Sequence, residues 1–375
     1  MLPLAEPYVL QLDPYKPGKS IRDTEREYGV ADVVKLASNE NPFGPSPKAL
    51  EAAQKALYDG HMYPNILRGE VKECICAYLG SPEFQLKHIM LGNGSNELIS
   101  LLARALLSPR ESLLNAWPSF LVYRMAAQAM GRHEHTVPLS SAHEYDLEAM
   151  VDIAKARTSH PVKLVFIANP NNPTGRYITR SDLERFFATI PEDIVVVFDE
   201  AYADYVDAPD YESALRYVLV RPRTVVLKTF SKIYGMAGFR IGYAVADPQI
   251  NDIIHRVRDP FNVNGIAQAA AMAALQDNAH VAKSRQNNSA EMPRVVTALQ
   301  ELGLVITPSA ANFVLVHLAP HMPSVPKVME ALIRRGVIVR SLENYDLPSA
   351  LRVTIGTPAQ NGRFLNAMAA VLKTG

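Results

Sequence analysis

Short apolar runs alternate with amphipathic segments between about residues 46 and 245. The clearest runs are rich in β-branched residues and lie at 88–91, 112–115, 162–168, 194–198, 224–228 and 241–246. Between them lie longer segments with helical spacing, such as 119–130 and 181–190. This alternation is typical of βαβ units, and unbroken apolar runs suit strands that are covered on both faces. The pattern therefore predicts an α/β fold with a mostly parallel, seven-stranded sheet between helices.

The pattern changes after about residue 261. A long Ala-rich helix is followed by two strands, a helix, two further strands and a last helix, with the strands and the middle helix near 304–306, 312–317, 325–335, 337–340 and 351–355. A chain of 375 residues exceeds the size at which one core usually stops growing. We therefore expect a smaller α+β domain at 263–375, a large domain at 46–262, and an N-terminal arm at 1–45 that forms part of the small domain.

Charge and composition exclude several classes of partner. The 38 Lys and Arg residues balance the 38 Asp and Glu residues without forming like-charged blocks, so we expect no binding to nucleic acid or to an anionic membrane surface. No basic segment followed by an apolar run opens the chain, and no stretch is long enough to span a membrane. These features predict a cytoplasmic protein with small-molecule partners.

Cysteine and histidine spacing predicts no metal site. Cys74 and Cys76 are two residues apart on a helical segment, so their side chains point in different directions and are expected to be free thiols. His133 and His135 alternate on a predicted strand, and the ten histidines show no ligand spacing.

Glycines follow the first strong strand of the predicted sheet. Gly92 and Gly94 lie between that strand and a helix that is expected to begin near Ser95. Backbone N–H groups at a helix start lie at the positive end of its dipole and form an anion site. A plain glycine turn with a serine cap and the nearby Glu97 is an equally good interpretation of this segment alone.

Polar residues follow the next strands at the edge where α/β folds bind ligands. Asn172 lies in the turn after 162–168, and Asp199 and Tyr202 follow 194–198. These residues would place an amide, a carboxylate and a phenol close together. A single acid at a strand end is more often a solvated loop residue.

A lysine surrounded by hydroxyl groups follows the strand at 224–228. Thr229 and Ser231 flank Phe230 and precede Lys232, and Arg240 follows eight residues later. Two hydroxyls and a guanidinium around one lysine suit a phosphate monoester next to an amine. Lys232 alone would be assigned to the surface, but four short motifs at the ends of successive strands are a far more specific signal.

At these motifs the sequence resembles the pyridoxal 5′-phosphate (PLP) dependent aminotransferases of fold type I, and within them the histidinol-phosphate aminotransferase family. The resemblance covers nearly the whole chain. Besides the motifs above, it rests on the segments 13–19, 26–29, 36–45, 63–64 and 351–357.

The resemblance implies a set of site residues. Lys232 would hold the cofactor and move a proton, Asp199 would pair with the pyridine nitrogen, and Tyr202 would contact the 3′-oxygen. The implied cofactor contacts are Gly94, Ser95, Asn96, Phe120, Asn172, Asp199, Tyr202, Thr229, Ser231, Lys232 and Arg240, with Tyr63 from a neighbouring subunit of a homodimer with shared active sites. The implied substrate contacts are Tyr15, Asn41, Arg340 and Arg352. Asn96 and Phe120 stand where the family usually has an acid and often a tyrosine.

The same resemblance implies transamination between L-histidinol phosphate and 2-oxoglutarate in histidine biosynthesis, by a ping-pong route through pyridoxamine phosphate. Aromatic amino-acid aminotransferases share most of these strings, and Phe120 lacks a hydroxyl that could touch substrate. A decarboxylase of threonine phosphate is a second alternative. A third is a PLP-binding effector domain of a transcription regulator, which the zero net charge and the lack of a preceding DNA-binding domain disfavour.

Overall fold

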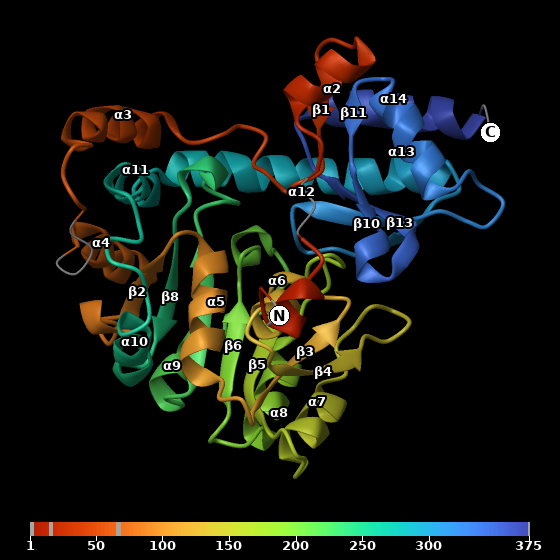
Figure 1. The fold of residues 1–375 in the computed structure, drawn as a ribbon. Helices are drawn as coiled ribbons and strands as arrows, with labels where there is room; N and C mark the ends of the chain where they lie inside the picture. The colour runs from red at the N-terminus through yellow and green to blue at the C-terminus, as the bar shows by residue number, and fades with distance from the viewer. Residues whose placement is uncertain (1–3, 15–17, 65–68, 374–375) are drawn as a thin grey trace.

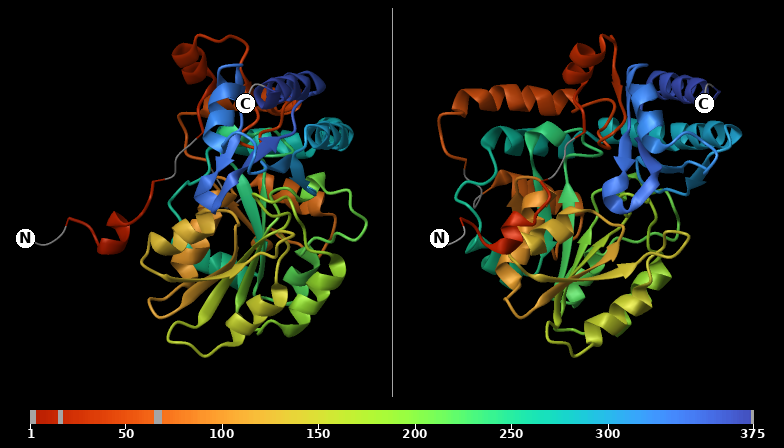
Figure 2. Two further views of the ribbon diagram at one scale, coloured as in Figure 1. Left: turned by 90° about the vertical axis from the view of Figure 1, so that its right-hand side faces the viewer. Right: turned by 45° about the vertical axis from the view of Figure 1, so that its right-hand side comes forward.

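The computed structural model describes residues 4–14, 18–64 and 69–373. They form a seven-stranded sheet, a four-stranded sheet and a pair of short strands (Figure 1). The α/β fold with a mostly parallel seven-stranded sheet and a smaller α+β part is confirmed. Both views of Figure 2 show the small sheet and its helices above the large sheet. The limits of the domains stay a prediction.

The large sheet has the order β2-β8-β7-β6-β5-β3-β4. Its strands are β2 (Ile89–Gly92), β3 (Ser112–Trp117), β4 (His133–Pro138), β5 (Val162–Ala168), β6 (Val195–Asp199), β7 (Thr224–Thr229) and β8 (Gly242–Ala246). The five strands β4, β3, β5, β6 and β7 run parallel to one another, and β8 is antiparallel to β2 and β7. The carboxyl ends of β3, β5, β6 and β7 therefore meet at one edge.

Helices surround both sheets. They are α1 (Pro7–Leu10), α2 (Ile21–Tyr28), α3 (Pro47–Ala56), α4 (Glu70–Leu79), α5 (Ser95–Leu106), α6 (Val122–Gln128), α7 (Leu147–Lys155), α8 (Arg180–Thr189), α9 (Leu215–Val220), α10 (Pro248–His255), α11 (Gly265–Leu275), α12 (Asn278–Glu301), α13 (Val325–Ile333) and α14 (Pro358–Lys373). Cys74 and Cys76 lie in α4 as free thiols, as expected. In the described ranges, no helix combines the length and the apolar character needed to cross a membrane.

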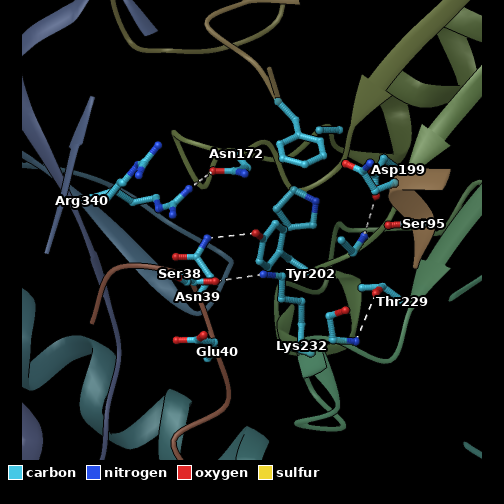
Figure 3. Close-up of a pocket in the computed structure, with 18 of the residues that line it drawn as sticks. Ser38, Asn39, Glu40, Ser95, Asn172, Asp199, Tyr202, Thr229, Lys232 and Arg340 are labelled. Carbon is cyan, nitrogen blue, oxygen red and sulfur yellow. Dashed lines mark hydrogen bonds between the residues drawn. The ribbon is translucent and has the colours of Figure 1, made fainter. Parts of the chain in front are cut away.

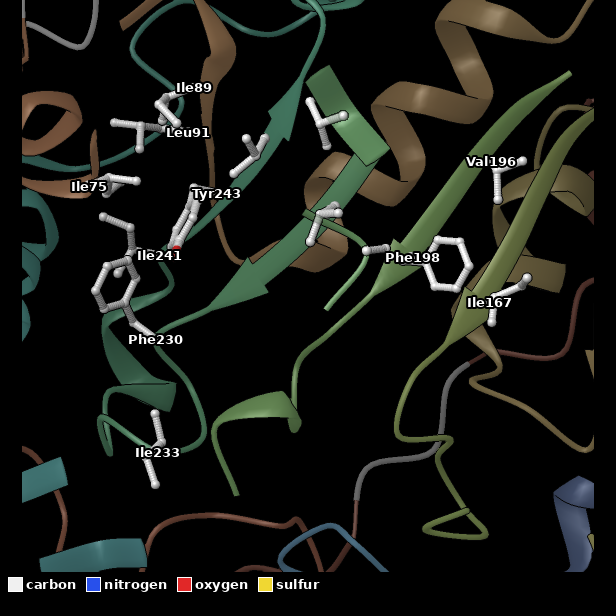
Figure 4. Packing of buried hydrophobic residues seen from close by; sticks show 14 of the residues in the cluster. Ile75, Ile89, Leu91, Ile167, Val196, Phe198, Phe230, Ile233, Ile241 and Tyr243 are labelled. Atoms are coloured by element: carbon white, nitrogen blue, oxygen red, sulfur yellow. The ribbon is translucent and has the colours of Figure 1, made fainter. Parts of the chain in front are cut away.

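The two faces of the large sheet bury separate apolar cores. Val196 and Phe198 point to the core that contains side chains of α3, α4, α7, α8, α9 and α11 (Figure 4). Val195 and Val197 point to the core beneath α5, α6 and α10. Side chains alternate along a strand, so Asp199 lies on the α5 and α6 side and Glu200 on the other.

The small sheet is antiparallel, with the order β12-β13-β10-β9. Its strands are β9 (Val305–Thr307), β10 (Phe313–His317), β12 (Arg340–Leu342) and β13 (Leu347–Thr354). Side chains of α12, α13 and α14 cover it. The N-terminal strand β1 (Val34–Lys35) pairs with β11 (Val337–Ile338), so the segment after β1 enters from the small-sheet side.

Two predicted elements of the C-terminal part are each divided in two. The strand expected at 337–340 is β11 and β12, which belong to different sheets. The single helix expected after 261 is α11 and α12, because Asp277 caps a new helix by accepting from the His280 N–H. The pattern of apolar residues does not show where an extended segment passes from one sheet to another, or where one helix ends and the next begins. Neither break was therefore predicted from the sequence.

A buried ion pair supports the strand ends from below. Lys228 Nζ lies 2.8 Å from Glu200 Oε2, and the Glu200 side chain is 0% exposed. Glu200 also accepts from the Ser213 hydroxyl and the Ala214 N–H, both at 2.7 Å. Burial acts to lower the pKa of Lys228, but Glu200 and other anionic neighbours raise the pKa above its ordinary value overall.

Replacing this lysine should destabilise the fold strongly. Lys228→Met leaves the Glu200 charge buried without its partner, and breaking such a pair costs about 3–5 kcal/mol. Urea unfolding of the variant should show the loss. Lys55→Met is the matched control, because its pair with Glu51 lies on the surface. Equal unfolding midpoints for the two variants would contradict this account of the ion pair.

Candidate functional site

A cavity lies between the edge of the large sheet, the small sheet and the segment after β1 (Figure 3). It brings together most of the residues that the sequence singled out, namely Ser95, Asn96, Phe120, Asn172, Asp199, Tyr202, Thr229, Ser231, Lys232, Arg240, Arg340 and Arg352. It is also lined by Ser38, Asn39, Glu40, Tyr123 and Tyr345, which the sequence analysis did not single out.

The parallel register explains why the chemistry gathers here. Ala168, the last residue of β5, pairs with Asp199, the last residue of β6. Asp199 in turn pairs with Leu227 of β7, two residues before Thr229. The loops that carry Asn172, Tyr202 and Lys232 therefore leave the sheet at the same edge.

Asp199 is the buried acid of the site. Its Oδ2 accepts from the Tyr123 hydroxyl at 2.9 Å, and its Oδ1 accepts from the Ala201 N–H at 3.2 Å. Burial raises the pKa of Asp199 to about 6, although these hydrogen bonds and the charge of Lys232 act to lower it. A carboxyl group in this setting is best matched by a ligand that brings a positively charged N–H.

Tyr123 is a functional candidate that sequence reasoning missed. It is fully buried, and its ring stacks on Phe166 with centroids 4.8 Å apart. Burial raises the pKa of Tyr123 well above its ordinary value, and the Asp199 charge raises it further. The Tyr123 hydroxyl therefore keeps its proton and remains a hydrogen-bond donor. In the sequence Tyr123 fits the apolar face of a helix and is indistinguishable from a core residue.

Lys232 and Tyr202 lie beside the segment that follows β1. Lys232 Nζ donates to the Ser38 carbonyl at 3.1 Å and lies 5.5 Å from the centre of the Tyr202 ring. The Tyr202 hydroxyl accepts from Asn39 Nδ2 at 2.9 Å. Asn39 is itself fixed by Thr354, whose hydroxyl accepts from the Asn39 N–H at 2.9 Å. One N-terminal segment thus positions an amine and a phenol from two loops of the large sheet.

One end of the cavity suits a phosphate monoester. Helix α5 begins at Ser95 after Gly94, which has φ +77°. A Cβ at Gly94 would lie 2.5 Å from Arg240 Nη2, so only glycine fits both the backbone and the guanidinium. The N–H groups at the start of α5, Arg240, and the hydroxyls of Thr229 and Ser231 meet the needs of a dianion.

The other end carries two arginines. Arg340 and Arg352 are direct partners on β12 and β13, and Arg340 lies across the cavity from Asp199 (Figure 3). Arg352 donates to Asn172 Oδ1 and, at 2.8 Å, to the Ala37 carbonyl. No described residue forms a hydrogen bond with its buried Nε. This end is therefore suited to anionic groups of a second ligand.

Of the predicted residues that the structure describes, three do not line the cavity. Gly94 lies just beneath Arg240. Asn41 is buried, and its side chain is fully engaged with Ile233, Ser284 and Phe43, so it anchors its segment. Tyr63 is 81% exposed. Tyr15 lies outside the described residues.

In the described ranges, histidines, cysteines and acids form no group of three or more that could hold a metal ion.

Comparison with known proteins gives the site its context. Residues 31–368 match the family model of class I and II aminotransferases. The chain belongs to this family.

The chain is 46% identical over 371 residues to a histidinol-phosphate aminotransferase of Anaeromyxobacter sp. (strain Fw109-5), covering 99% of this chain and 100% of that protein. It is 45% identical to histidinol-phosphate aminotransferase 1 of Nitrosococcus oceani, covering 99% and 97%. A crystal structure of histidinol-phosphate aminotransferase from Sinorhizobium meliloti in complex with pyridoxal-5'-phosphate matches with a TM-score of 0.89 and 25% identity, covering 100% of this chain and 99% of that one. The family resemblance inferred from the sequence is confirmed.

The buried acid should make the ligand-free protein less stable at neutral pH. The folded pKa of Asp199, about 6, lies above its ordinary value of 3.8, so folding opposes ionisation. The cost is fully present above pH 6 and disappears as pH falls from about 6 to about 4.

Asp199→Asn should therefore stabilise the ligand-free protein at pH 7.5 by up to about 3 kcal/mol, since the amide can still accept from Ala201 and donate to Tyr123. Urea unfolding of variant and wild type at pH 7.5 and pH 4.5 measures the difference. A gain that is equal at both pH values would show that the ionisation of Asp199 is not its cause.

Proposed function

We propose that this protein transfers an amino group from L-histidinol phosphate to 2-oxoglutarate with the help of PLP. The observation that carries the proposal is that Arg340 and Arg352 share one cavity with Lys232 and Asp199. This arrangement offers an amine and a buried acid for chemistry beside two cations for an anionic substrate. The names of the full-length relatives support the same reaction.

The described side chains fit the cofactor. The start of α5, Thr229, Ser231 and Arg240 would hold its phosphate, and Phe120 would cover one face of its ring. The buried Asp199 would face the pyridine nitrogen. When bound, PLP supplies an electron sink that stabilises negative charge at the substrate carbon next to the amine.

Each catalytic side chain then has a defined role. Asp199 would keep a proton on the pyridine nitrogen, and Tyr123 would hold the carboxylate in place by its 2.9 Å hydrogen bond. Tyr202 and Asn172 would donate to the ring oxygen. Lys232 Nζ would hold the cofactor before substrate arrives, and would then move a proton from the substrate carbon. The protein thereby directs where the proton leaves and where it returns.

The two arginines would serve both halves of the reaction. The phosphate of histidinol phosphate is a dianion that two guanidinium groups match better than one, and Tyr15 is a further proposed donor. 2-Oxoglutarate brings two carboxylates to the same pocket. In an ordinary amino acid such as phenylalanine, Arg352 alone would bind the carboxylate.

Other reactions remain distinguishable by experiment. A solved L-threonine-O-3-phosphate decarboxylase from Porphyromonas gingivalis has the same fold, with a TM-score of 0.78 and 23% identity. Presenting the PLP-loaded protein with histidinol phosphate, phenylalanine or threonine phosphate separates the possibilities. Amino transfer and carbon dioxide release are both measured.

Arg340→Ala should distinguish the two amino donors. Removing one partner of a buried charge pair costs about 2–5 kcal/mol, and about 1.4 kcal/mol corresponds to a tenfold change. The kcat/KM for histidinol phosphate should therefore fall by roughly 30- to 3000-fold. The kcat/KM for phenylalanine should change much less, because Arg352 can still bind its carboxylate. Equal losses for both donors, or a wild-type preference for phenylalanine, would favour an aromatic aminotransferase.

We also propose a homodimer with shared active sites in the cytoplasm. Tyr63 is 81% exposed and stacks on Phe261, with ring centroids 4.6 Å apart. Leu57, Tyr58 and Met62 are exposed beside it in the sequence. Exposed apolar groups of this size often mark an interface, and a second copy would bring Tyr63 to the cofactor phosphate of its neighbour. The free thiols Cys74 and Cys76 suit a reducing compartment.

Subunit mixing tests the shared site. Lys232→Ala and Tyr63→Ala each impair both sites of their own dimers, but a hybrid dimer has one site with both residues intact. Mixing the two variants should therefore restore activity. Each hybrid dimer should reach at most the activity of one wild-type active site. Absence of recovery, with subunit exchange proven by differently tagged chains, would argue against a contribution of Tyr63 across the interface.

A further inference from the structure

Trp117 lies where the large sheet meets the small sheet, and it is the single tryptophan of the chain. It is the last residue of β3 and pairs with Pro138 of β4. Its carbonyl accepts from the Leu139 N–H at 2.9 Å. Its backbone is therefore part of the large sheet, three residues before the cavity-lining Phe120.

The side chain of Trp117 reaches the small sheet. The indole Nε1 donates to Asp346 Oδ2 at 2.7 Å, and the ring stacks on Tyr345 with centroids 5.8 Å apart and planes 16° apart. Trp117 also packs against a cluster that includes Leu315 and Leu342 of the small sheet. A hydrogen bond, a ring stack and apolar packing thus join the sheets at one point.

Arg124 and Glu134 hold the indole from the large-sheet side. The Arg124 guanidinium carbon lies 3.9 Å from the centre of the Trp117 ring, a distance at which a cation attracts the ring face. Arg124 is itself held by Glu134 of β4, with Nε 3.1 Å from Oε2. The ring therefore has restraints from both sheets.

The strand that carries Arg340 is weakly anchored in its sheet. β12 contains three residues, lies at the edge of the small sheet, and shifts register between Ser341 and Leu342. The segment just after it carries Tyr345, which is buried and lines the same cavity as Arg340. Trp117 contacts this segment, so the position of the segment depends on the large sheet.

Arg352 is held differently. It lies on β13, which has neighbours on both sides. Its guanidinium donates to Asn172 and to the Ala37 carbonyl. Its position therefore does not need Trp117, and the two arginines should respond differently when the indole is changed.

We propose that Trp117 is a positioning residue that fixes Arg340 and Tyr345 relative to the end of the cavity that would hold the cofactor. Trp117 thereby sets the affinity for the substrate's phosphate group. This inference rests on the proposed function, in which Arg340 binds that phosphate. Trp117 does not line the cavity, so it acts through Tyr345 and Asp346.

Trp117→Phe removes the N–H donor and keeps an aromatic ring for Tyr345. A hydrogen bond to a charged group contributes about 1.5–3 kcal/mol, and this one is solvent-exposed. We therefore expect the KM for histidinol phosphate to rise about 3- to 10-fold with kcat changed less than about twofold. The constant for phenylalanine, measured as KM or as a competitive inhibition constant, should stay within about twofold.

Asp346→Asn is the matched control. Asp346 has φ +59°, a conformation that asparagine tolerates, and the asparagine side-chain oxygen can still accept from the indole. Its KM for histidinol phosphate should remain near that of the wild type. A KM that rises equally for both ligands in Trp117→Phe, or a loss of thermal stability without any change in KM, would show a purely structural role and overturn the proposal.

The emission of Trp117 supplies a readout that needs no turnover. Inorganic phosphate titrated into the PLP-loaded protein should change the emission saturably in the wild type and should leave it unchanged in Arg340→Ala. If the emission of the wild type does not change when phosphate is added, the proposed coupling between Trp117 and Arg340 is wrong. If the wild type does not use histidinol phosphate, the proposed function fails, and this titration alone decides the role of Trp117.

Discussion

The buried carboxyl group of Asp199 is the constraint on which the rest of the site depends. It ends a central strand whose residues are all buried, and burial raises its pKa to about 6. The fold tolerates this cost because Tyr123 and Ala201 donate to the carboxylate. A ligand N–H that carries positive charge would relieve the remaining cost. The strain of the ligand-free site and the affinity for a pyridinium ring therefore have the same origin.

The cavity exists only because distant parts of the chain meet. The large sheet supplies the acid, the lysine and the phosphate site, the small sheet supplies both arginines, and the segment after β1 lies between them. Asn39 illustrates the dependence, because it is fixed by Thr354 of the small sheet and donates to Tyr202 of the large sheet. Any change in how the sheets meet would alter the geometry of catalysis and of substrate binding together.

Much of this site could be predicted from the sequence because its motifs are local. Asp199 is the last residue of the apolar strand β6, and Lys232 lies three residues after the end of β7. The strand order and the register then bring these two residues together. Tyr123 and Trp117 escaped prediction because their partners are 76 and 229 residues away in the sequence. A buried tyrosine on a helix and a tryptophan at a strand end look like ordinary core residues until tertiary contacts are known.

We propose that the amine of Lys232 holds the cofactor opposite Asp199. Reducing the PLP-loaded protein with borohydride makes that attachment permanent, and peptide mapping by mass spectrometry locates it. We expect one pyridoxyl group per chain, on the peptide that contains Lys232, and no such group in Lys232→Ala. A label on another lysine, or an unlabelled Lys232 peptide in protein that retains PLP, would contradict it.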